Sequence, residues 1–265
     1  MARALLLCDV MFSLSRPFIF FTFAISLFAS LEGRAAEFRP WTWLGSDCAN
    51  CSIVIQPVEN RSELESSEVK AFLRALETQK PQLLSLYGVH GQEYNLLAHM
   101  AVGILGRESA FFESTRYQLK EMFPGVVKAF KVVKAYVAAA RGQSFKVSSN
   151  SRGPTQIKRI PDKIIQAYAI TTDDLGIPEN AAVATMGYLI EALQEMKRRI
   201  EAGQLTYIQP QNYVDYLPYL YFGSGRTLVT RVAEPHRNLY VRAMKSYMSW
   251  VQVYESTEPA PVQLR

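Results

Sequence analysis

The 265-residue sequence predicts an all-α protein. Apolar residues recur at helical spacing in successive segments, and neither an internal repeat nor a series of alternating strands competes with that pattern. At 49% hydrophobic and 20% charged residues, the chain has the composition of an ordinary globular protein that is long enough to bury a core. We therefore expect one domain over residues 61–254, with an extension before it and a short tail at 255–265.

The N-terminus has the features of a secretory signal. Arg16 precedes the apolar run "PFIFFTFAISLFASL", which is too short to cross a membrane comfortably. Gly33 and Ala35 are small residues that flank a cleavage point after Ala35. We predict that residues 1–35 are a signal peptide, and that the protein is exported to the periplasm or secreted without a stable membrane anchor. An uncleaved anchor is the alternative.

Residues 36–60 are interpreted as an irregular N-terminal extension. They contain aromatic, Pro and Gly residues and one short β-like run, "SIVIQ". Cys48 and Cys51 lie in this extension, and in an exported chain they can form a disulfide or remain a thiol pair. We expect a local staple, because no second cysteine pair is present to complete a zinc site.

The remaining helices are predicted from apolar periodicity and from helix-start and helix-stop residues. Ser62 and Glu65 form a capping-box pattern before the first apolar stripe. Lysines at three-residue spacing lie on one side of the third helix, where a solvent-exposed face is the plain interpretation. The expected helices are 62–79, 92–112, 124–142, 178–202 and 235–254.

Glu108 is the candidate catalytic residue. It follows the apolar run "LLAHMAVGIL" and precedes Phe111 and Phe112, so its carboxyl group is expected to be partly removed from water. Desolvation favours the protonated form of a carboxyl group, which is the form that a general acid needs. Most helix-end glutamates are simply exposed, so the functional interpretation depends on the blocks that follow.

Several blocks occur in one order along the chain, and together they resemble those of the lytic transglycosylase and goose-type lysozyme superfamily. The blocks are "RESAFF", "SRGPTQIKRIP", "ENAAVATMGYLIEAL" (with Asn180, Gly187, Tyr188 and Leu189 at corresponding positions), "LYFGSGR" and "EPHRNLYVRAMKSY". The resemblance implies a lysozyme-like helical domain with a substrate groove, preceded by the short irregular segment. It also implies peptidoglycan glycan strands as the partner.

The resemblance assigns roles residue by residue. Glu108 corresponds to the acid that protonates the oxygen between N-acetylmuramic acid (MurNAc) and N-acetylglucosamine (GlcNAc). Gln156 corresponds to a groove glutamine that bonds sugar substituents, with Ile157 and Tyr188 also at substrate-binding positions. Tyr221 corresponds to a tyrosine that holds the carboxylate or the substrate. A solvent-facing glutamine and a core tyrosine are the plain alternatives for Gln156 and Tyr221.

The acidic residues near Glu108 bear on the reaction type. No Asp lies between Glu108 and Gln156, and the other acids of that stretch are Glu113 and Glu121. A hydrolase normally needs a second carboxylate, whereas the family's transglycosylases use one carboxylate twice and release a 1,6-anhydro product. The sequence therefore favours a lytic transglycosylase. A lysozyme-type hydrolase with a base from elsewhere, and a catalytically idle peptidoglycan-binding protein, remain alternatives.

This chain also departs from the family pattern. Pro154 and Thr155 replace the usual Leu-Met, and Phe222 replaces the loop asparagine. If the altered block faces the sugar, it would suit a modified glycan. A de-N-acetylated strand carries ammonium groups, which would favour nearby acids such as Glu113 or Glu121.

Other function classes lack support in the sequence. The histidines, His90, His99 and His236, are not spaced as a metal cluster, and His99 is expected to be a core side chain. We predict no metal and no cofactor. Despite a net charge of +5, the basic residues are dispersed without a nucleic-acid-binding motif, so nucleic acid is not an expected partner. We expect a monomer.

Overall fold

The structure is a computed structural model that describes residues 52–142 and 151–256, and these belong to one compact unit, Phe38–Arg265. The predicted signal peptide, Cys48, Cys51 and most of the predicted tail lie outside the described residues. The predictions made for those segments therefore stay predictions.

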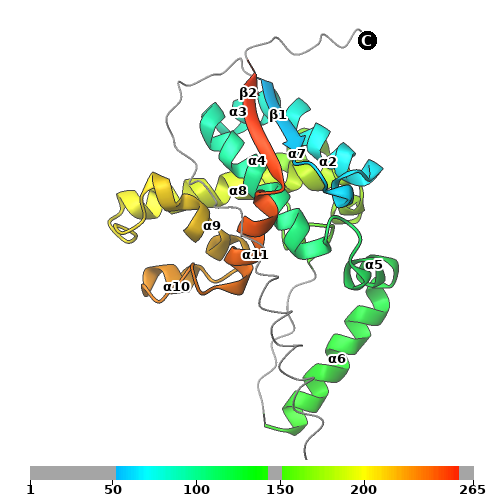
Figure 1. Cartoon of the computed structure of the whole chain (residues 1–265). Helices are drawn as coiled ribbons and strands as arrows, with labels where there is room; N and C mark the ends of the chain where they lie inside the picture. Colours follow the sequence, from blue (N-terminus) through cyan, green and yellow to red (C-terminus); the bar gives the residue numbers. More distant parts are fainter. Residues whose placement is uncertain (1–51, 143–150, 257–265) are drawn as a thin grey trace, which may run out of the picture. The chain divides into compact units, whose positions relative to one another are not determined.

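Helices dominate the described residues, which confirms the coarse prediction of an all-α fold (Figure 1). One two-stranded sheet accompanies them. Three short 3₁₀ turns cover Ser62–Leu64, Thr172–Gly176 and Pro210–Asn212. The strands and helices are β1 Ser52–Pro57, α2 Ser67–Thr78, α3 Lys80–Tyr87, α4 Gly91–Ser109, α5 Thr115–Met122, α6 Pro124–Ala140, α7 Asp162–Tyr168, α8 Pro178–Glu201, α9 Tyr213–Tyr221, α10 Gly225–Val229, α11 Leu239–Met248 and β2 Val251–Ser256.

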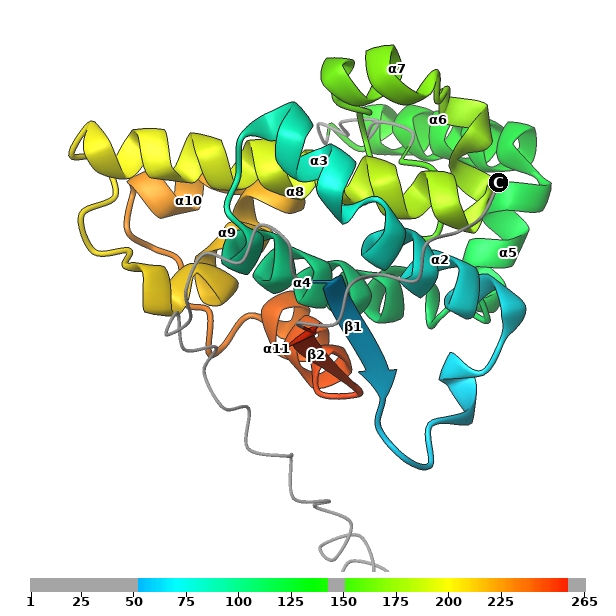
Figure 2. The same ribbon diagram turned by 90° about the horizontal axis from the view of Figure 1, so that it is seen from above.

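Helix α4 is the central helix of the core. Almost all of its residues are buried, because α8 and α11 pack against it (Figure 2). Two glycines permit the close approach of α11: a Cβ atom at Gly103 would lie 2.6 Å from the Met244 carbonyl oxygen, and one at Gly106 would lie 2.5 Å from Tyr247 Cγ. The C-terminal helix is thereby held against the turn of α4 that carries Glu108.

Helix α2 begins later than predicted. Its N-cap is Ser66, whose hydroxyl accepts a hydrogen bond from the Val69 amide at 3.2 Å. The capping box predicted at Ser62 and Glu65 is wrong, since Ser62 starts a separate 3₁₀ turn. The helix that starts after the Ser66 cap packs its apolar stripe against α8.

Strands β1 and β2 pair antiparallel, from Ser52 opposite Ser256 to Pro57 opposite Val251. The β-like run "SIVIQ" predicted in the extension is confirmed, because it belongs to β1. The predicted end of the last helix is wrong, since α11 ends at Met248 instead of reaching Tyr254. Each segment becomes a strand only because the other one supplies its backbone partners.

Candidate active site

A groove with a volume of about 890 Å³ lies at the C-terminal end of α4. Helix α5, the loop after residue 150, the end of α9 and Tyr247 of α11 supply the other walls. Glu108, Gln156 and Tyr221 come from three separate sequence blocks, and all three line this one groove. The full lining is Gly106, Arg107, Glu108, Ala110, Ser114, Arg116, Tyr117, Leu119, Lys120, Ser151, Gln156, Lys158, Tyr221, Phe222 and Tyr247.

Glu108 is half-buried in the last turn of α4. The helix was predicted to continue to Phe112, but Ala110, Phe111 and Phe112 have φ values of 49°, 56° and 73°. Non-glycine residues in the left-handed region cost energy and persist only where surrounding contacts hold them. Three in succession end the helix at Ser109, one residue after the glutamate, and turn the chain back towards the core.

The Phe111 side chain anchors this turn. It is 1% exposed, its ring stacks on Trp250 at 5.3 Å, and it meets the edge of Tyr247 at 5.5 Å. Burial of an aromatic ring with two aromatic neighbours offsets the backbone strain. The residue after the helix C-cap is therefore a core residue, and Glu108 is left at the groove.

Ser109 stabilises the C-terminal end of α4. Its side chain is fully buried, and its hydroxyl donates to the Leu105 carbonyl oxygen at 2.9 Å and accepts from the Phe112 amide at 3.1 Å. The Ser114 amide donates to the Ser109 carbonyl oxygen at 2.8 Å. One residue thus satisfies backbone groups on both sides of the left-handed turn.

The charge of Glu108 affects the pKa of two tyrosines, Tyr221 and Tyr240. Burial first, and then the charge of Glu108, raise the pKa of Tyr221 well above its usual value. The same two causes, in the same order, raise the pKa of Tyr240 well above its usual value. The Tyr240 hydroxyl is buried, and no hydrogen bond of standard geometry joins it to the described residues. Both phenols therefore stay neutral near Glu108.

Tyr240 was missed as a site residue, although it lies in the "LYVRAMKSY" segment that contributed to the resemblance. Its ring packs on Phe222 at 4.9 Å, and the Arg107 guanidinium lies 5.3 Å from the ring centre. Its place in that segment was the one signal in the sequence that could have singled it out among the fourteen tyrosines.

Tyr221 holds the neighbouring loop. Its buried hydroxyl donates to the Thr155 carbonyl oxygen at 2.6 Å. Thr155 is itself fully buried, and its hydroxyl lies 2.7 Å from that of Thr185 on α8. The hypothesis that Pro154 and Thr155 face the sugar is wrong, because both are buried against the body of the domain. The Pro154 and Thr155 side chains therefore contribute to packing beneath the groove, and other residues form the groove surface.

Gln156 lies in the groove with φ of 56°. Its Oε1 accepts hydrogen bonds from Lys120 and from Ser151, and its Nε2 donates to the Gly153 carbonyl oxygen at 2.7 Å. Lys120 also donates to the Ser151 hydroxyl at 2.9 Å. The amide group is therefore held in a defined orientation by its neighbours, and a bound sugar would compete with Lys120 for its oxygen.

Ile157 and Tyr188 do not line the groove. Ile157 is 3% exposed and packs in the core, so its side chain is not part of the described groove lining, and its substrate-binding role stays a prediction. Tyr188 is half-buried, and the edge of its ring meets Tyr221 at 5.3 Å. The sequence blocks that carry the resemblance therefore contain packing residues as well as groove residues, and burial separates the two.

The groove is strongly basic around its single acid. Glu108 is the one acidic residue of the described lining, whereas Arg107, Arg116, Lys120 and Lys158 are basic. These cations were not predicted, since they are scattered over the sequence and meet only in the fold. Such a lining attracts anionic groups and disfavours ammonium groups.

The two acids that a deacetylated glycan was expected to meet are placed elsewhere. Glu113 is exposed and is not part of the described lining. The Glu121 carboxylate accepts a hydrogen bond from the Gly153 amide at 3.1 Å and so fastens the loop to α5. Neither residue adds negative charge to the lining of the groove.

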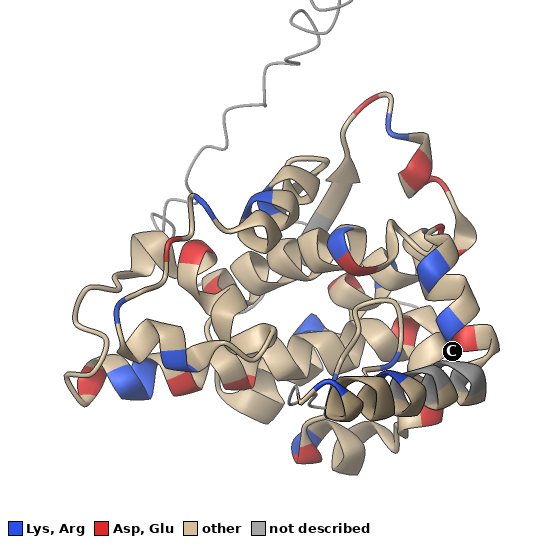
Figure 3. Ribbon diagram, turned by 90° about the horizontal axis from the view of Figure 1, so that it is seen from below, with Lys and Arg blue, Asp and Glu red and all other residues tan. Residues whose placement is uncertain are grey.

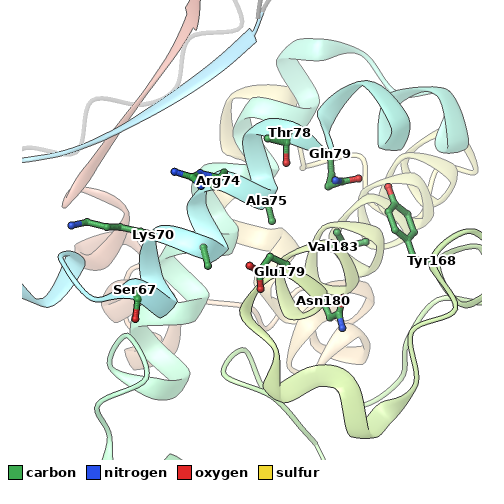
Figure 4. A pocket seen from close by; sticks show the side chains of 11 residues that line it. Ser67, Lys70, Arg74, Ala75, Thr78, Gln79, Tyr168, Glu179, Asn180 and Val183 are labelled. Carbon is green, nitrogen blue, oxygen red and sulfur yellow. The ribbon is translucent and has the colours of Figure 1, made fainter. Parts of the chain in front are cut away.

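A second hollow of about 440 Å³ lies between α2 and α8 (Figure 4). Asn180, which the resemblance placed among its motif positions, lines this hollow, and its side chain donates to the Asp174 carbonyl oxygen at 3.5 Å. Lys70, also in the lining, pairs with Glu65 at 2.7 Å. Asn180 therefore supports the start of α8, away from the groove.

Two further findings concern metals and membranes. His99 is buried and contacts the Met248 carbonyl oxygen, as expected of a core histidine, and burial lowers its pKa. Within residues 52–142 and 151–256, no group of three or more His, Cys, Asp and Glu is placed to hold a metal ion. No helix of the same residues combines the length and the apolarity needed to cross a membrane.

Comparison with known proteins adds no relative. No family model, curated protein or solved structure matches this chain. The groove, its residues and their chemistry therefore carry the functional proposal.

Proposed function

We propose that this protein cleaves peptidoglycan glycan strands at the β-1,4 bond between MurNAc and GlcNAc, as an exported lytic transglycosylase with Glu108 as general acid and base. One observation carries the proposal: Glu108 is the single acidic residue of the described groove lining, and Gln156 and Tyr221 line the same groove. The resemblance assigned roles to these three residues from separate sequence blocks, and all three line one groove.

The proposed reaction uses one carboxyl group in two steps. The protonated Glu108 donates its proton to the bridging oxygen as the bond to MurNAc C1 breaks. The resulting carboxylate removes the proton from the C6 hydroxyl of the same MurNAc, whose oxygen then bonds to C1. The product is a 1,6-anhydro end, and no water is consumed. Two neutral phenols nearby, Tyr221 and Tyr240, add no competing negative charge.

The alternative of a water-using hydrolase has less support. Such enzymes place a second carboxylate within about 10 Å of the first, either as nucleophile or as base. The described groove lining contains no second acid, and Glu121 is engaged with the Gly153 amide. An idle binding protein would have no use for an acid held at a strained helix end.

The basic lining supports glycan strands with free carboxylates as the substrate class. Native strands carry carboxylates on the lactyl group or the stem peptide, and these suit Arg116 and Lys158, which are both exposed. Removal of N-acetyl groups would instead bring ammonium groups into a basic groove. A deacetylated strand is therefore a less suitable substrate than the native strand.

Mass spectrometry of soluble products tests the proposal. The protein, a Glu108→Gln variant and a Glu113→Gln control are each incubated with purified peptidoglycan. We expect anhydromuramyl ends from the unaltered protein and the control, and none from Glu108→Gln. Reducing ends in place of anhydro ends would establish a hydrolase. Absence of any soluble product, with the protein retained on the insoluble wall, would establish a binding protein.

A further inference from the structure

Helix α6 carries an exposed apolar face that the core does not use. Val132, Val133, Tyr136 and Val137 are 44%, 60%, 76% and 44% exposed, and we call these four residues the α6 face. At roughly 100° per residue they occupy one continuous arc of roughly 140° around the helix. More than half of the large exposed apolar side chains lie on α5, on α6 or between them.

Met122 and Phe123, at the corner between α5 and α6, are 61% and 52% exposed (Figure 1). They extend the apolar character to the start of α6. A soluble protein rarely leaves so many large apolar side chains together in water without a partner. The α6 face is therefore a candidate interaction surface.

The charged residues of this helix have one sign. Residues 122–142, which include α6, contain four Lys and Arg and no Asp or Glu. Helices α2 and α8 each carry residues of both signs, and Figure 3 shows acidic and basic segments side by side elsewhere in the fold. Lys134 and Arg141 are exposed, and both fall on the same side of the arc, next to Val137. The partner of this helix must therefore offer apolar and anionic groups together.

We propose that α6 docks on the surface of an anionic lipid bilayer, lying in the interface with the α6 face towards the acyl chains. Lys134 and Arg141 would reach the phosphate-containing headgroups at the edge of that face. A second copy of this chain would oppose one cluster of positive charge to another. A glycan strand is too polar to cover the apolar arc.

The inference is independent of the proposed function, but it bears on where that function occurs. Helix α5 precedes α6 directly and supplies Arg116, Tyr117, Leu119 and Lys120 to the wall of the groove. Docking of α6 would keep this wall close to the membrane surface. The proposed enzyme would then act on strands near the bilayer.

Co-sedimentation with vesicles tests the proposal. The protein is used without residues 1–35, because they lie outside the compact unit Phe38–Arg265 and their apolar run would bind lipid by itself. Vesicles of phosphatidylcholine alone are compared with vesicles of equal parts phosphatidylcholine and phosphatidylglycerol. We expect the partition coefficient to be at least about tenfold higher for the anionic vesicles, and to fall as salt rises.

Two variants separate the apolar and charged contributions. Val133→Ser with Tyr136→Ser should lower the partition coefficient on anionic vesicles at least about tenfold. Lys134→Glu with Arg141→Glu should remove the preference for anionic over neutral vesicles. All four side chains are exposed, so the far-ultraviolet circular dichroism and the thermal unfolding temperature should change little.

The matched control is Val229→Ser with Val232→Ser, which removes two exposed valines, 46% and 65% exposed, outside α6. This control should bind vesicles as the unaltered protein does. Equal binding of all variants, or no binding to anionic vesicles, would overturn the proposal. If light scattering instead detects a dimer that the Val133 and Tyr136 variant abolishes, and vesicles are not bound, then the α6 face is a contact between copies.

Discussion

Ser109→Ala is the sharpest test of how the fold presents Glu108. The Ser109 hydroxyl is the link between the last turn of α4 and the three left-handed residues that follow. Alanine has the higher helix propensity, so a simple helix argument predicts slight stabilisation. The structure predicts the opposite, because the hydroxyl satisfies the Phe112 amide across the turn.

The expected magnitude follows from the two hydrogen bonds. The Leu105 carbonyl oxygen lies within α4 and keeps its place in the helix ladder, so the loss there is small. The part-buried Phe112 amide loses its partner, which costs about 1–3 kcal/mol in the free energy of unfolding. For a domain of this size, that corresponds to a fall in Tm of roughly 2–12 °C.

Thermal and urea unfolding measure this change, with release of anhydromuramyl products as the second readout. Ser246→Ala is the control, since Ser246 is an exposed residue of α11 and should change stability by less than about 0.5 kcal/mol. We expect kcat to fall more than KM changes, because the carboxyl group is displaced while the groove walls remain. Stability and kcat both within error of the unaltered protein would refute the idea that Ser109 holds the turn.

Four further outcomes are expected. Phe111→Ala should lower the free energy of unfolding by about 3–5 kcal/mol in urea unfolding, because a fully buried ring that packs on two aromatic rings is removed. Tyr221→Phe should cost about 1–3 kcal/mol, since the buried Thr155 carbonyl oxygen loses its donor, and a wild-type melting curve would contradict this. Folding raises the pKa of Tyr240, so the contribution of this phenol to the free energy of unfolding is complete below about pH 10. That contribution is lost at higher pH, by at most about 1.4 kcal/mol per pH unit. Tyr240→Phe should flatten this alkaline decline in stability without lowering stability at neutral pH. Chemically deacetylated peptidoglycan should be cut more slowly than the native form, with the gap narrowing at high salt; equal rates would argue against the basic groove as a selector.

The helices with strong periodicity and clear ends were predictable from the sequence. Pro124–Ala140 and Pro178–Glu201 agree with the expected ranges to within two residues, because proline at the first position marks each start. The convergence of Glu108, Gln156 and Tyr221 in one groove agrees with the roles that the resemblance assigned to these residues.

The remaining features depend on contacts between distant residues. The left-handed turn at Ala110–Phe112 is held by the Ser109 hydroxyl and by Trp250, and no local propensity favours it. Sequence alone also could not tell that Thr155 points into the core while Lys158 points into the groove. Side-chain direction in a loop is decided by what the loop packs against, and α8 lies far along the chain.

The pairing of β1 with β2 determines the shortest fragment of this chain that can be expressed by itself. A shortened protein cut at the predicted limits, residues 61–254, would lack β1 and keep most of β2 without its hydrogen-bonding partner. The Glu77 carboxylate would lose the Ile55 amide, which donates to it at 2.9 Å, while the burial that raises its pKa would in part remain. A bare strand edge invites pairing with other molecules. Expression of the helical body by itself should therefore give aggregates, whereas a fragment from residue 52 to residue 256 should stay in solution.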